Sequence, residues 1–270
     1  MTELALEQLV HVYADGGVRA VDGVTLRIGS GERVALIGQN GSGKTTLVRH
    51  LNGLLRPTSG RVLVDGTDAA TSTVATLARS VGLVFQDPDR QIFSPSVRGE
   101  VEFGARNIGL RGAALEEAVT AALAATGLGD VPASNPYDLG GSRRKLLALA
   151  SVLAMRTPVL VLDEPTTGQD ARGDERVRRV IEAASATGRT VIAVSHDMPF
   201  VAECFDRVVV MRAGRVILDE TPQVVFAADA WEALRSTFVE PPLPALVGDR
   251  LRVGSTPTDA DLLRALAGGG

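Results

Sequence analysis

A glycine-rich segment that begins at Gly38 constrains this chain more than any other feature. It fits the pattern G-x-x-x-x-G-K-[ST], in which glycines let backbone N–H groups point inward around a phosphate. Residues 33–37 before it predict a buried strand, and residues 45–52 after it predict a helix that ends at Gly53. The N-terminus of that helix adds positive potential. We therefore expect a phosphate-binding loop made of Gly38, Gln39, Asn40, Gly41, Ser42, Gly43, Lys44, Thr45 and Thr46.

The lysine of this pattern is unusual for the chain. Lys44 and Lys145 are the only lysines among 28 basic residues, and arginine supplies the rest of the positive charge. A lysine ammonium is a compact point charge, whereas a guanidinium is broad and planar. We infer that the position of Lys44 requires a compact ammonium against phosphate oxygens.

Composition excludes several classes of function. The net charge of −4 and the pI near 5.5 give no bulk attraction to nucleic acid, so we expect no nucleic-acid partner. One cysteine, Cys204, excludes an internal disulfide. The N-terminus lacks the basic and then apolar layout of a signal peptide, and apolar runs such as 146–155 are too short to span a membrane. We expect a chain that does not cross a membrane by itself.

Strand and helix patterns alternate along the chain. Alternating residues predict antiparallel strands at 4–13 and 18–28, and further strands at 61–64 and 81–85. Helical character covers 97–126, where the helix stops at Gly127, and helices are also expected at 143–155 and 259–266. Strands at 159–162, 190–194 and 207–211 are separated by helical or turn segments, which favours a parallel sheet with crossover helices.

These patterns predict an α/β fold with a phosphate-loop core. The core has a mostly parallel sheet and an antiparallel β subdomain, and a helical subdomain is inserted into it. We assign residues 1–86 and 157–222 to the core, 87–156 to the helical subdomain and 223–270 to a small C-terminal extension.

Two acids follow the apolar residues 159–162. A buried strand would bring Asp163 and Glu164 to its C-terminal end, where nucleotide sites of open α/β sheets form. In phosphate-loop enzymes, an Asp placed in this way holds Mg²⁺ through water while the Thr hydroxyl, here Thr45, binds it directly. Glu164 can deprotonate the attacking water, a contribution of about 10²–10⁴-fold in rate.

With these residues in order over 4–222, the chain resembles the ATPase subunit of an ABC transporter. The resemblance implies ATP as substrate and Mg²⁺ as cofactor. It implies that Tyr13 stacks on adenine and that Gln86 contacts Mg²⁺ and water and links the site to a membrane subunit. It also implies that Asp170 lies in the loop joining the two sites of a dimer, and that His196 hydrogen-bonds the γ-phosphate.

One motif departs from the family pattern. The family carries Leu-Ser-Gly-Gly-Gln before a basic helix, whereas this chain has Leu-Gly-Gly-Ser-Arg at 139–143. In the family this loop binds the γ-phosphate held by the opposite subunit, as a helix N-terminus can. Gly140 and Gly141 keep the flexible backbone, and Ser142 offers a hydroxyl in place of the missing serine.

This departure is similar to what energy-coupling factor (ECF) transporter ATPases carry. Residues 84–95, the Thr-Thr-Gly-Gln-Asp segment and the Glu-Pro-Pro-Leu tail at 240–243 also resemble that group. The resemblance implies uptake of a vitamin or a transition-metal ion. It implies a second ATPase subunit (identical or paralogous), a transmembrane coupling subunit against residues 86–102 and a substrate-capture membrane protein. The chain would lie on the cytoplasmic face of the cell membrane as a peripheral subunit.

Three alternatives stay open at this point. A conventional ABC importer or exporter uses the same ATPase. A non-transport ABC ATPase acting on DNA or ribosomes usually carries coiled-coil inserts, basic patches or two ATPase halves, which this sequence lacks. A phosphate-loop kinase or GTPase is disfavoured by the Glu after Asp163, by His196 and by the loop at 139–143.

Overall fold

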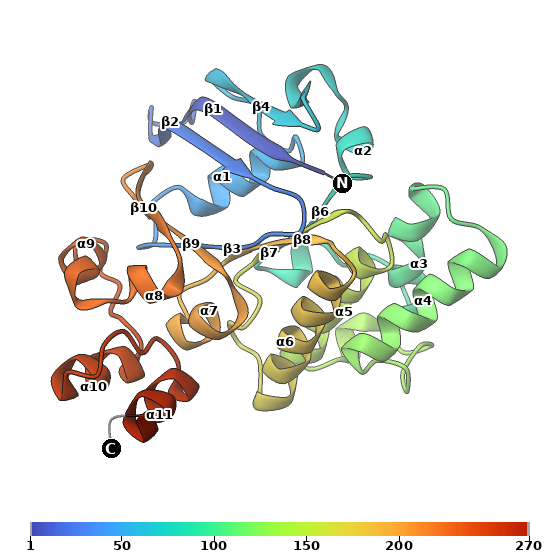
Figure 1. The fold of residues 1–270 in the computed structure, drawn as a ribbon. Coiled ribbons are helices and arrows are strands. Elements are labelled where there is room, and N and C mark those ends of the chain that lie inside the picture. Colours follow the sequence, from blue (N-terminus) through green and yellow to red (C-terminus); the bar gives the residue numbers. More distant parts are fainter. Residues whose placement is uncertain (1, 269–270) are drawn as a thin grey trace.

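Two sheets and a set of flanking helices make up the chain (Figure 1). The computed structural model describes residues 2–268. The larger sheet has the strand order β10-β9-β3-β8-β7-β6, and only β10 runs antiparallel to its neighbour. Its strands are β3 (Arg33–Ile37), β6 (Val81–Val84), β7 (Val159–Asp163), β8 (Thr190–Val194), β9 (Arg207–Arg212) and β10 (Arg215–Glu220).

The smaller sheet is antiparallel, with the order β2-β1-β4-β5. Its strands are β1 (Leu4–Val12), β2 (Arg19–Ile28), β4 (Ser59–Val64) and β5 (Thr67–Asp68). The predicted α/β class, with a mostly parallel sheet and an antiparallel β part, is confirmed.

The parallel sheet separates two hydrophobic clusters. Side chains alternate along β3: Ala35 and Ile37 join a cluster with the helices on one face, while Val34 and Leu36 join a cluster with α1 (Lys44–Leu51) and the antiparallel sheet. Because both faces are covered, the central strands are apolar at nearly every position, as their sequences indicated.

Helices α3 (Val97–Asn107), α4 (Gly112–Thr126) and α5 (Gly141–Leu153) pack on one another beside this sheet. The sequence predicted one helical region over 97–126, but the structure has a break in it. Gly109 has φ +104°, a left-handed conformation that interrupts the helical backbone. The predicted stop at Gly127 is confirmed, since this residue caps α4 with φ +66°.

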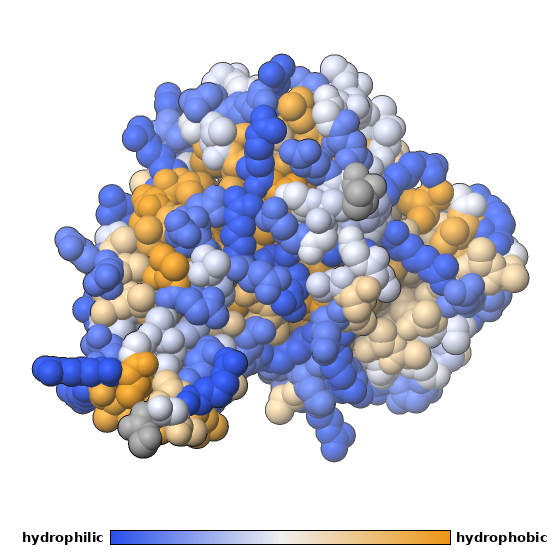
Figure 2. Space-filling model, in the orientation of Figure 1, coloured by the Kyte–Doolittle hydropathy of each residue, from blue (hydrophilic) through white to orange (hydrophobic). Residues whose placement is uncertain are grey.

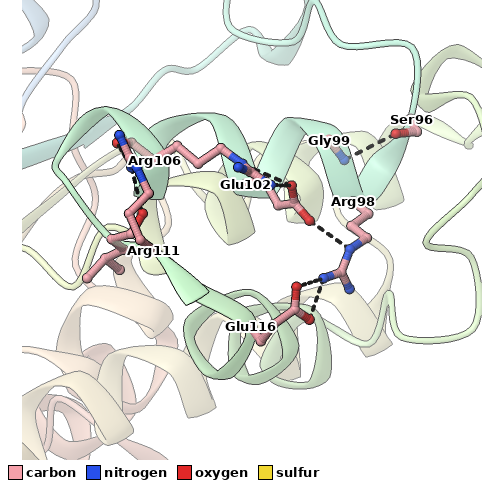
Figure 3. Close-up of polar contacts among 8 residues, drawn as sticks. Ser96, Arg98, Gly99, Glu102, Arg106, Arg111 and Glu116 are labelled. Atoms are coloured by element: carbon pink, nitrogen blue, oxygen red, sulfur yellow. Dashed lines mark hydrogen bonds and ion pairs between the residues drawn. The ribbon is translucent and has the colours of Figure 1, made fainter. Parts of the chain in front are cut away.

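One ion pair joins α3 to α4, and two more lie within α3 (Figure 3). Arg98 of α3 donates to Glu116 of α4 at 2.6 Å and also pairs with Glu102 at 2.7 Å. Glu102 also accepts a hydrogen bond from Arg106. This hydrogen bond is the main reason that the pKa of Glu102 lies below its ordinary value. Such partly exposed pairs stabilise weakly one by one, so the buried contacts between these helices carry most of the packing.

The remaining helices are α2 (Val74–Leu77), α6 (Ala171–Ala186), α7 (Met198–Cys204), α8 (Pro222–Val225), α9 (Trp231–Arg235), α10 (Leu243–Leu251) and α11 (Asp259–Gly268). Of these, α6 and α7 cover one face of the parallel sheet, α2 packs with the antiparallel sheet, and α8 to α11 form the C-terminal part. The predicted last helix is confirmed as α11, whereas α10 was not predicted, although Pro244 near its start is a typical signal. Orange areas at the lower left of Figure 2 overlie these two helices, which expose Leu243, Leu251, Leu263 and Leu266.

None of the described helices is long and apolar enough to cross a membrane.

A buried histidine pair ties the antiparallel sheet to α1. His50 places Nδ1 2.7 Å from the Thr46 carbonyl oxygen and Nε2 3.1 Å from Nδ1 of His11, which also faces the carbonyl of Arg56. Because both carbonyls can only accept, each Nδ1 carries its proton and Nε2 of His50 accepts from His11. This arrangement leaves the His50 ring neutral, because its Nε2 accepts rather than donates. Burial is the main reason that the pKa of His50 lies below its ordinary value, and the hydrogen bond to the Thr46 carbonyl opposes this effect.

Core packing gives a first prediction. Phe200 is fully buried and packs edge-on against Phe205, with ring centroids 5.5 Å apart. Phe200→Ala should lower the free energy of unfolding by about 3–5 kcal/mol, because it leaves a cavity. Urea unfolding measures this loss. Phe238→Ala is the matched control, since that ring is 86% exposed and its removal should change stability by no more than about 0.5 kcal/mol. Equal losses in the two variants would contradict this description of the core.

The histidine pair gives a second prediction, on the pH dependence of stability. The folded state binds a proton at His50 less readily than the unfolded state does, so stability falls as the pH drops below about 6.5. The loss is up to about 1.4 kcal/mol for each unit by which the two pKa values differ. His50→Asn keeps a donor for the Thr46 carbonyl but does not titrate, so its stability should fall less between pH 7.5 and pH 5.5. Urea unfolding of the unaltered chain and of His50→Asn at both pH values measures the two losses of stability. Equal losses in the two proteins would contradict the prediction.

Candidate active site

The candidate site lies at the C-terminal ends of three neighbouring parallel strands. The phosphate loop follows β3, Glu164 follows β7, and His196 follows β8, the strand between them. His196 therefore comes between the phosphate loop and Glu164. A pocket of about 940 Å³ opens here. Its lining comes from the loop, from these strand ends and from the C-terminal part: Gly38, Gln39, Asn40, Gln86, Glu164, Thr166, Thr167, His196, Asp197, Met198, Pro199, Phe238, Val239, Glu240, Pro241, Pro242 and Leu243.

Two glycines let the phosphate loop approach other backbone segments closely. Gly38 has φ +137°, and a Cβ atom there would lie 2.1 Å from the carbonyl oxygen of Met211. Gly43 has φ +102°, and a Cβ atom there would lie 2.1 Å from the carbonyl oxygen of Ala20. Only glycine is compatible with both the conformation and the space. Gly43 also caps α1 with no side-chain hydrogen bond, so the first N–H groups of α1 remain available for an anion.

Lys44 places a buried ammonium inside this loop. Its Nζ donates to the carbonyl oxygens of Gly38 at 2.7 Å and Gln39 at 2.9 Å. Burial lowers the pKa of Lys44, and the negative charges of Glu164 and Asp163 oppose this effect. Lys44 forms no salt bridge among the described residues. A buried cation whose direct partners are neutral oxygens fits a site that binds an anion.

Thr45 and Asp163 fit a magnesium site. The Thr45 hydroxyl donates to Asp163 Oδ1 at 3.1 Å, and burial raises the pKa of Asp163. A buried carboxylate beside a hydroxyl supplies the hard oxygen ligands that Mg²⁺ prefers, with water completing the shell. Gln86, after β6, is exposed and lines the same pocket. Over residues 2–268 no cluster of three or more His, Cys, Asp or Glu side chains has metal-binding geometry, so a site here relies on hydroxyl, amide and water ligands.

Glu164 is held in one orientation. Its Oε2 lies 2.7 Å from Nδ1 of His196 and also accepts from the Thr167 hydroxyl at 3.3 Å. Its φ of +53° is in the left-handed region, which costs a non-glycine residue about 1–3 kcal/mol and is found at functional sites. The Glu164 carboxylate is buried while the His196 side chain is 64% exposed. The imidazole therefore leaves Nε2 toward the open pocket.

Tyr13 lies at the side of the loop, after β1. Its hydroxyl is 3.1 Å from the Thr46 hydroxyl, and its ring meets His11 edge-on with the ring centroids 4.6 Å apart. Tyr13 is half-buried. The histidine pair thus positions this aromatic ring next to the start of α1, and its stacking on adenine stays a prediction.

The segment at 139–143 begins α5, as the motif predicted. Gly140 is the N-cap without a side-chain cap, and Gly140 and Gly141 are exposed with open space where a Cβ atom would be. The Ser142 hydroxyl donates to Gln169 Oε1 at 2.6 Å within the same chain. Arg143 donates to Asp130 at 2.6 Å, so it faces away from the glycines toward the end of α4.

Asp170 has a local role that the sequence did not predict. Its Oδ1 accepts from the N–H of Gly173 at 2.7 Å, which makes Asp170 the N-cap of α6. The same oxygen is 3.3 Å from the Ser142 hydroxyl. The loop after Glu164 and the start of α5 are therefore joined inside one chain.

Two further residues at this site were missed. Lys145 donates to the Thr167 carbonyl, and burial lowers its pKa. The sequence could have indicated a role for Lys145, because it is the only lysine besides Lys44. The side chain of Gln91 accepts from the N–H of Phe85 at 3.2 Å and donates to the Ala148 carbonyl at 2.8 Å, so it joins the end of β6 to α5.

The pocket wall at 238–243 was also missed. This segment lies far along the chain from the phosphate loop, and Phe238 has φ +56°. The Pro-Pro pair at 241–242 was visible as a break, but nothing in its sequence indicates which surface it would reach.

Comparison with known proteins identifies the family of the chain. Residues 21–167 match the family model described as ABC transporter. An energy-coupling factor transporter ATP-binding protein EcfA from Methanothermobacter thermautotrophicus is 38% identical over 96% of this chain and 83% of its own length. The energy-coupling factor transporter ATP-binding protein EcfA2 from Symbiobacterium thermophilum is 42% identical over 92% of this chain and 88% of its own length.

A solved structure is similar over nearly the whole chain. It is CbiO1 from Clostridium perfringens, described as part of the ABC transporter complex CbiONQ, and it is 37% identical with a TM-score of 0.75, over 92% of this chain and 98% of its own. A dimeric ATP-binding cassette in a post-hydrolysis state with ADP and Pi has a TM-score of 0.74 at 25% identity, over 81% of this chain and 98% of its own. The chain belongs to the ABC transporter family and, within it, to the energy-coupling factor transporter ATP-binding proteins.

Proposed function

We propose that this chain is the ATP-hydrolysing subunit of an ECF-type ABC importer and powers uptake of a vitamin or a transition-metal ion through partner membrane subunits. The observation that carries the proposal is the contact between Glu164 and His196, 2.7 Å apart, in the pocket that the phosphate loop lines. A carboxylate held by a second side chain beside a phosphate site is the arrangement that a general base requires. The similarity to ECF ATP-binding proteins supports the transport role.

The phosphate loop would hold the β- and γ-phosphates of ATP. Backbone N–H groups of residues 38–46 and the buried Lys44 ammonium supply the positive field. Thr45, Gln86 and Asp163 are the side chains that would hold Mg²⁺, which supplies charge neutralisation on the phosphate oxygens when bound. Tyr13 would stack on the adenine base.

Glu164 would take a proton from the attacking water. His196 Nδ1 lies 2.7 Å from Glu164 Oε2, and a donated N–H there would fix the carboxylate. A γ-phosphate oxygen can only accept, so His196 would reach it through a ring nitrogen that carries a proton, as both nitrogens do in the imidazolium form. The burial of Glu164 keeps this proton transfer away from bulk water.

A second ATPase subunit, identical or paralogous, would complete the site. In this proposal Gly140, Gly141 and Ser142 face the γ-phosphate held by the partner, and Asp170 lies where the two subunits meet. Exposure of both glycines at the N-terminus of α5 supports this role. To reach the partner's phosphate, the Ser142 hydroxyl would exchange its bond to Gln169 for one to the phosphate.

Membrane partners would contact residues 86–102, on the cytoplasmic face of the membrane. Phe93 in this segment is 59% exposed, and Phe103 beside it is 47% exposed; their rings meet edge-on at 4.6 Å. An exposed aromatic pair suits contact with a helix of a transmembrane coupling subunit. We also propose the division into a core (1–86 and 157–222), a helical subdomain (87–156) and a C-terminal extension (223–270), with a substrate-capture protein in the membrane and no nucleic-acid partner.

The role of Glu164 is tested by Glu164→Gln. The amide keeps an oxygen for the His196 N–H but is not a base, so ATP should still bind and hold a stable dimer while hydrolysis falls by about 10²–10⁴-fold. Phosphate release measures the rate, and size-exclusion chromatography with ATP measures the dimer. Glu182→Gln on the exposed face of α6 is the control and should hydrolyse ATP normally. Normal turnover by Glu164→Gln would remove this residue from its role.

The transport role is tested by isolating the intact complex from membranes. A transmembrane coupling subunit and a small substrate-capture protein should co-purify, with a vitamin or metal ion identified by mass spectrometry in the eluate. Replacing Phe93 and Phe103 with serine should release the ATPase from this complex while its ATP binding persists. Recovery with ribosomes or nucleic acid alone, or with a periplasmic binding protein, would contradict the ECF assignment.

A further inference from the structure

A second cavity lies outside the candidate active site and has no role in the proposed function. It is a groove of about 820 Å³ between α4 and α6. Its volume is within the range of 300–1,000 Å³ that is typical of small-molecule sites. The surface over α4, at the right of Figure 2, is pale orange, which marks moderately hydrophobic residues.

The lining of this groove divides into two chemical classes. The floor and walls are methyl-rich and come from α4, α5 and α6: Ala118, Ala121, Ala122, Ala124, Ala125, Leu153, Val180, Ala183 and Ala184. Four arginines also line it: Arg156, Arg176, Arg179 and Arg189. No acidic residue is among the lining residues.

Half of this positive charge is uncompensated. Arg156 pairs with Glu117 at 2.9 Å, and Arg179 pairs with Glu175 at 3.6 Å. Arg176 and Arg189 make no salt bridge with any residue in the described range 2–268.

The nearby carboxylate does not neutralise Arg176. The pKa of Asp130 is lowered first of all by its hydrogen bond to Arg143, at 2.6 Å. The charge of Arg176 is only a minor cause of this shift. Asp130 is therefore already paired with another arginine. Two guanidinium groups at one groove, in a chain whose net charge is −4, form a local site of opposite sign.

The backbone is shaped to hold these guanidinium groups. A Cβ atom on Gly127 would lie 2.4 Å from Nε of Arg176, so the glycine that ends α4 also leaves the space that Arg176 occupies. Arg189 is fixed by donating Nε to the Thr157 carbonyl at 2.7 Å, and Nη2 lies 3.3 Å from the Thr157 hydroxyl. Arg189 is therefore pre-positioned, which lowers the entropy cost of binding a ligand, and Gly127 leaves room for Arg176 beside it.

We propose that this groove binds a small anionic amphiphile, a molecule with an apolar body and one carboxylate, sulfonate or phosphate group. The methyl-rich floor suits the apolar body, and Arg176 with Arg189 suits the anionic group, since guanidinium donates paired N–H bonds to such oxyanions. Its occupant would bridge α4 and α6. The site is independent of the ATP pocket, so either proposal can fail without the other.

The test uses the full chain and 8-anilinonaphthalene-1-sulfonate, an aromatic sulfonate that fluoresces in apolar surroundings. We expect saturable binding. Arg176→Gln removes one charge without breaking an ion pair, and it should weaken binding about tenfold. Ala121→Glu places a carboxylate on the exposed side of α4 and should abolish binding, while glutamate keeps the helix propensity high. Circular dichroism verifies that both variants stay folded.

Matched controls identify the site and the ligand class. Arg250→Gln, which removes an exposed arginine of α10, should bind the dye as the unaltered chain does. Decanoate should displace the dye, whereas decanol and inorganic phosphate should not, because the site requires both an apolar body and a charge. Unchanged affinity for the dye in both Arg176→Gln and Ala121→Glu would overturn the proposal. Loss of dye binding in Leu263→Ser on α11, or displacement of the dye by ATP, would overturn it as well.

Discussion

The close approach of the phosphate loop to two other backbone segments is the constraint on which the rest of the site depends. Gly38 lies against the Met211 carbonyl at the end of β9, and Gly43 lies against the Ala20 carbonyl of β2. The Gly214 N–H donates to the Ser42 carbonyl at 3.0 Å, and the Asp22 N–H donates to Gly214 at 2.9 Å. The loop is thus held between the two sheets, and its N–H groups are oriented before any ligand arrives, as electrostatic preorganisation requires.

Much of this arrangement was predictable from sequence because it depends on local chemistry. The glycine spacing, the apolar strand before it and the acids after 159–162 each specify a local structure, and parallel strands place their C-terminal ends at one edge. Together these rules bring the start of the phosphate loop, Glu164 and His196 to one pocket. The resemblance to ABC ATPases added the family, which the match of residues 21–167 to the ABC transporter model confirms.

What the sequence could not predict depends on tertiary contacts. The wall at 238–243 reaches the phosphate loop from the C-terminal part, and no local pattern encodes that path. The bond from Ser142 to Gln169 likewise joins segments 27 residues apart, and the pairing of His11 with His50 joins segments 39 residues apart. In these two polar contacts each side chain has many possible partners, and only the packed fold selects one.

The wall at 238–243 distinguishes this subunit from ATPases that share only the common motifs. Residues 21–167 match the family model, whereas Phe238 and Leu243 lie beyond that range and still border the pocket. A compound that filled the space between the phosphate loop and these two apolar side chains would gain contacts that the shared motifs do not provide. An inhibitor selective for one ATPase among many related ones would therefore depend on contacts with residues 238–243 rather than with the nucleotide-binding motifs.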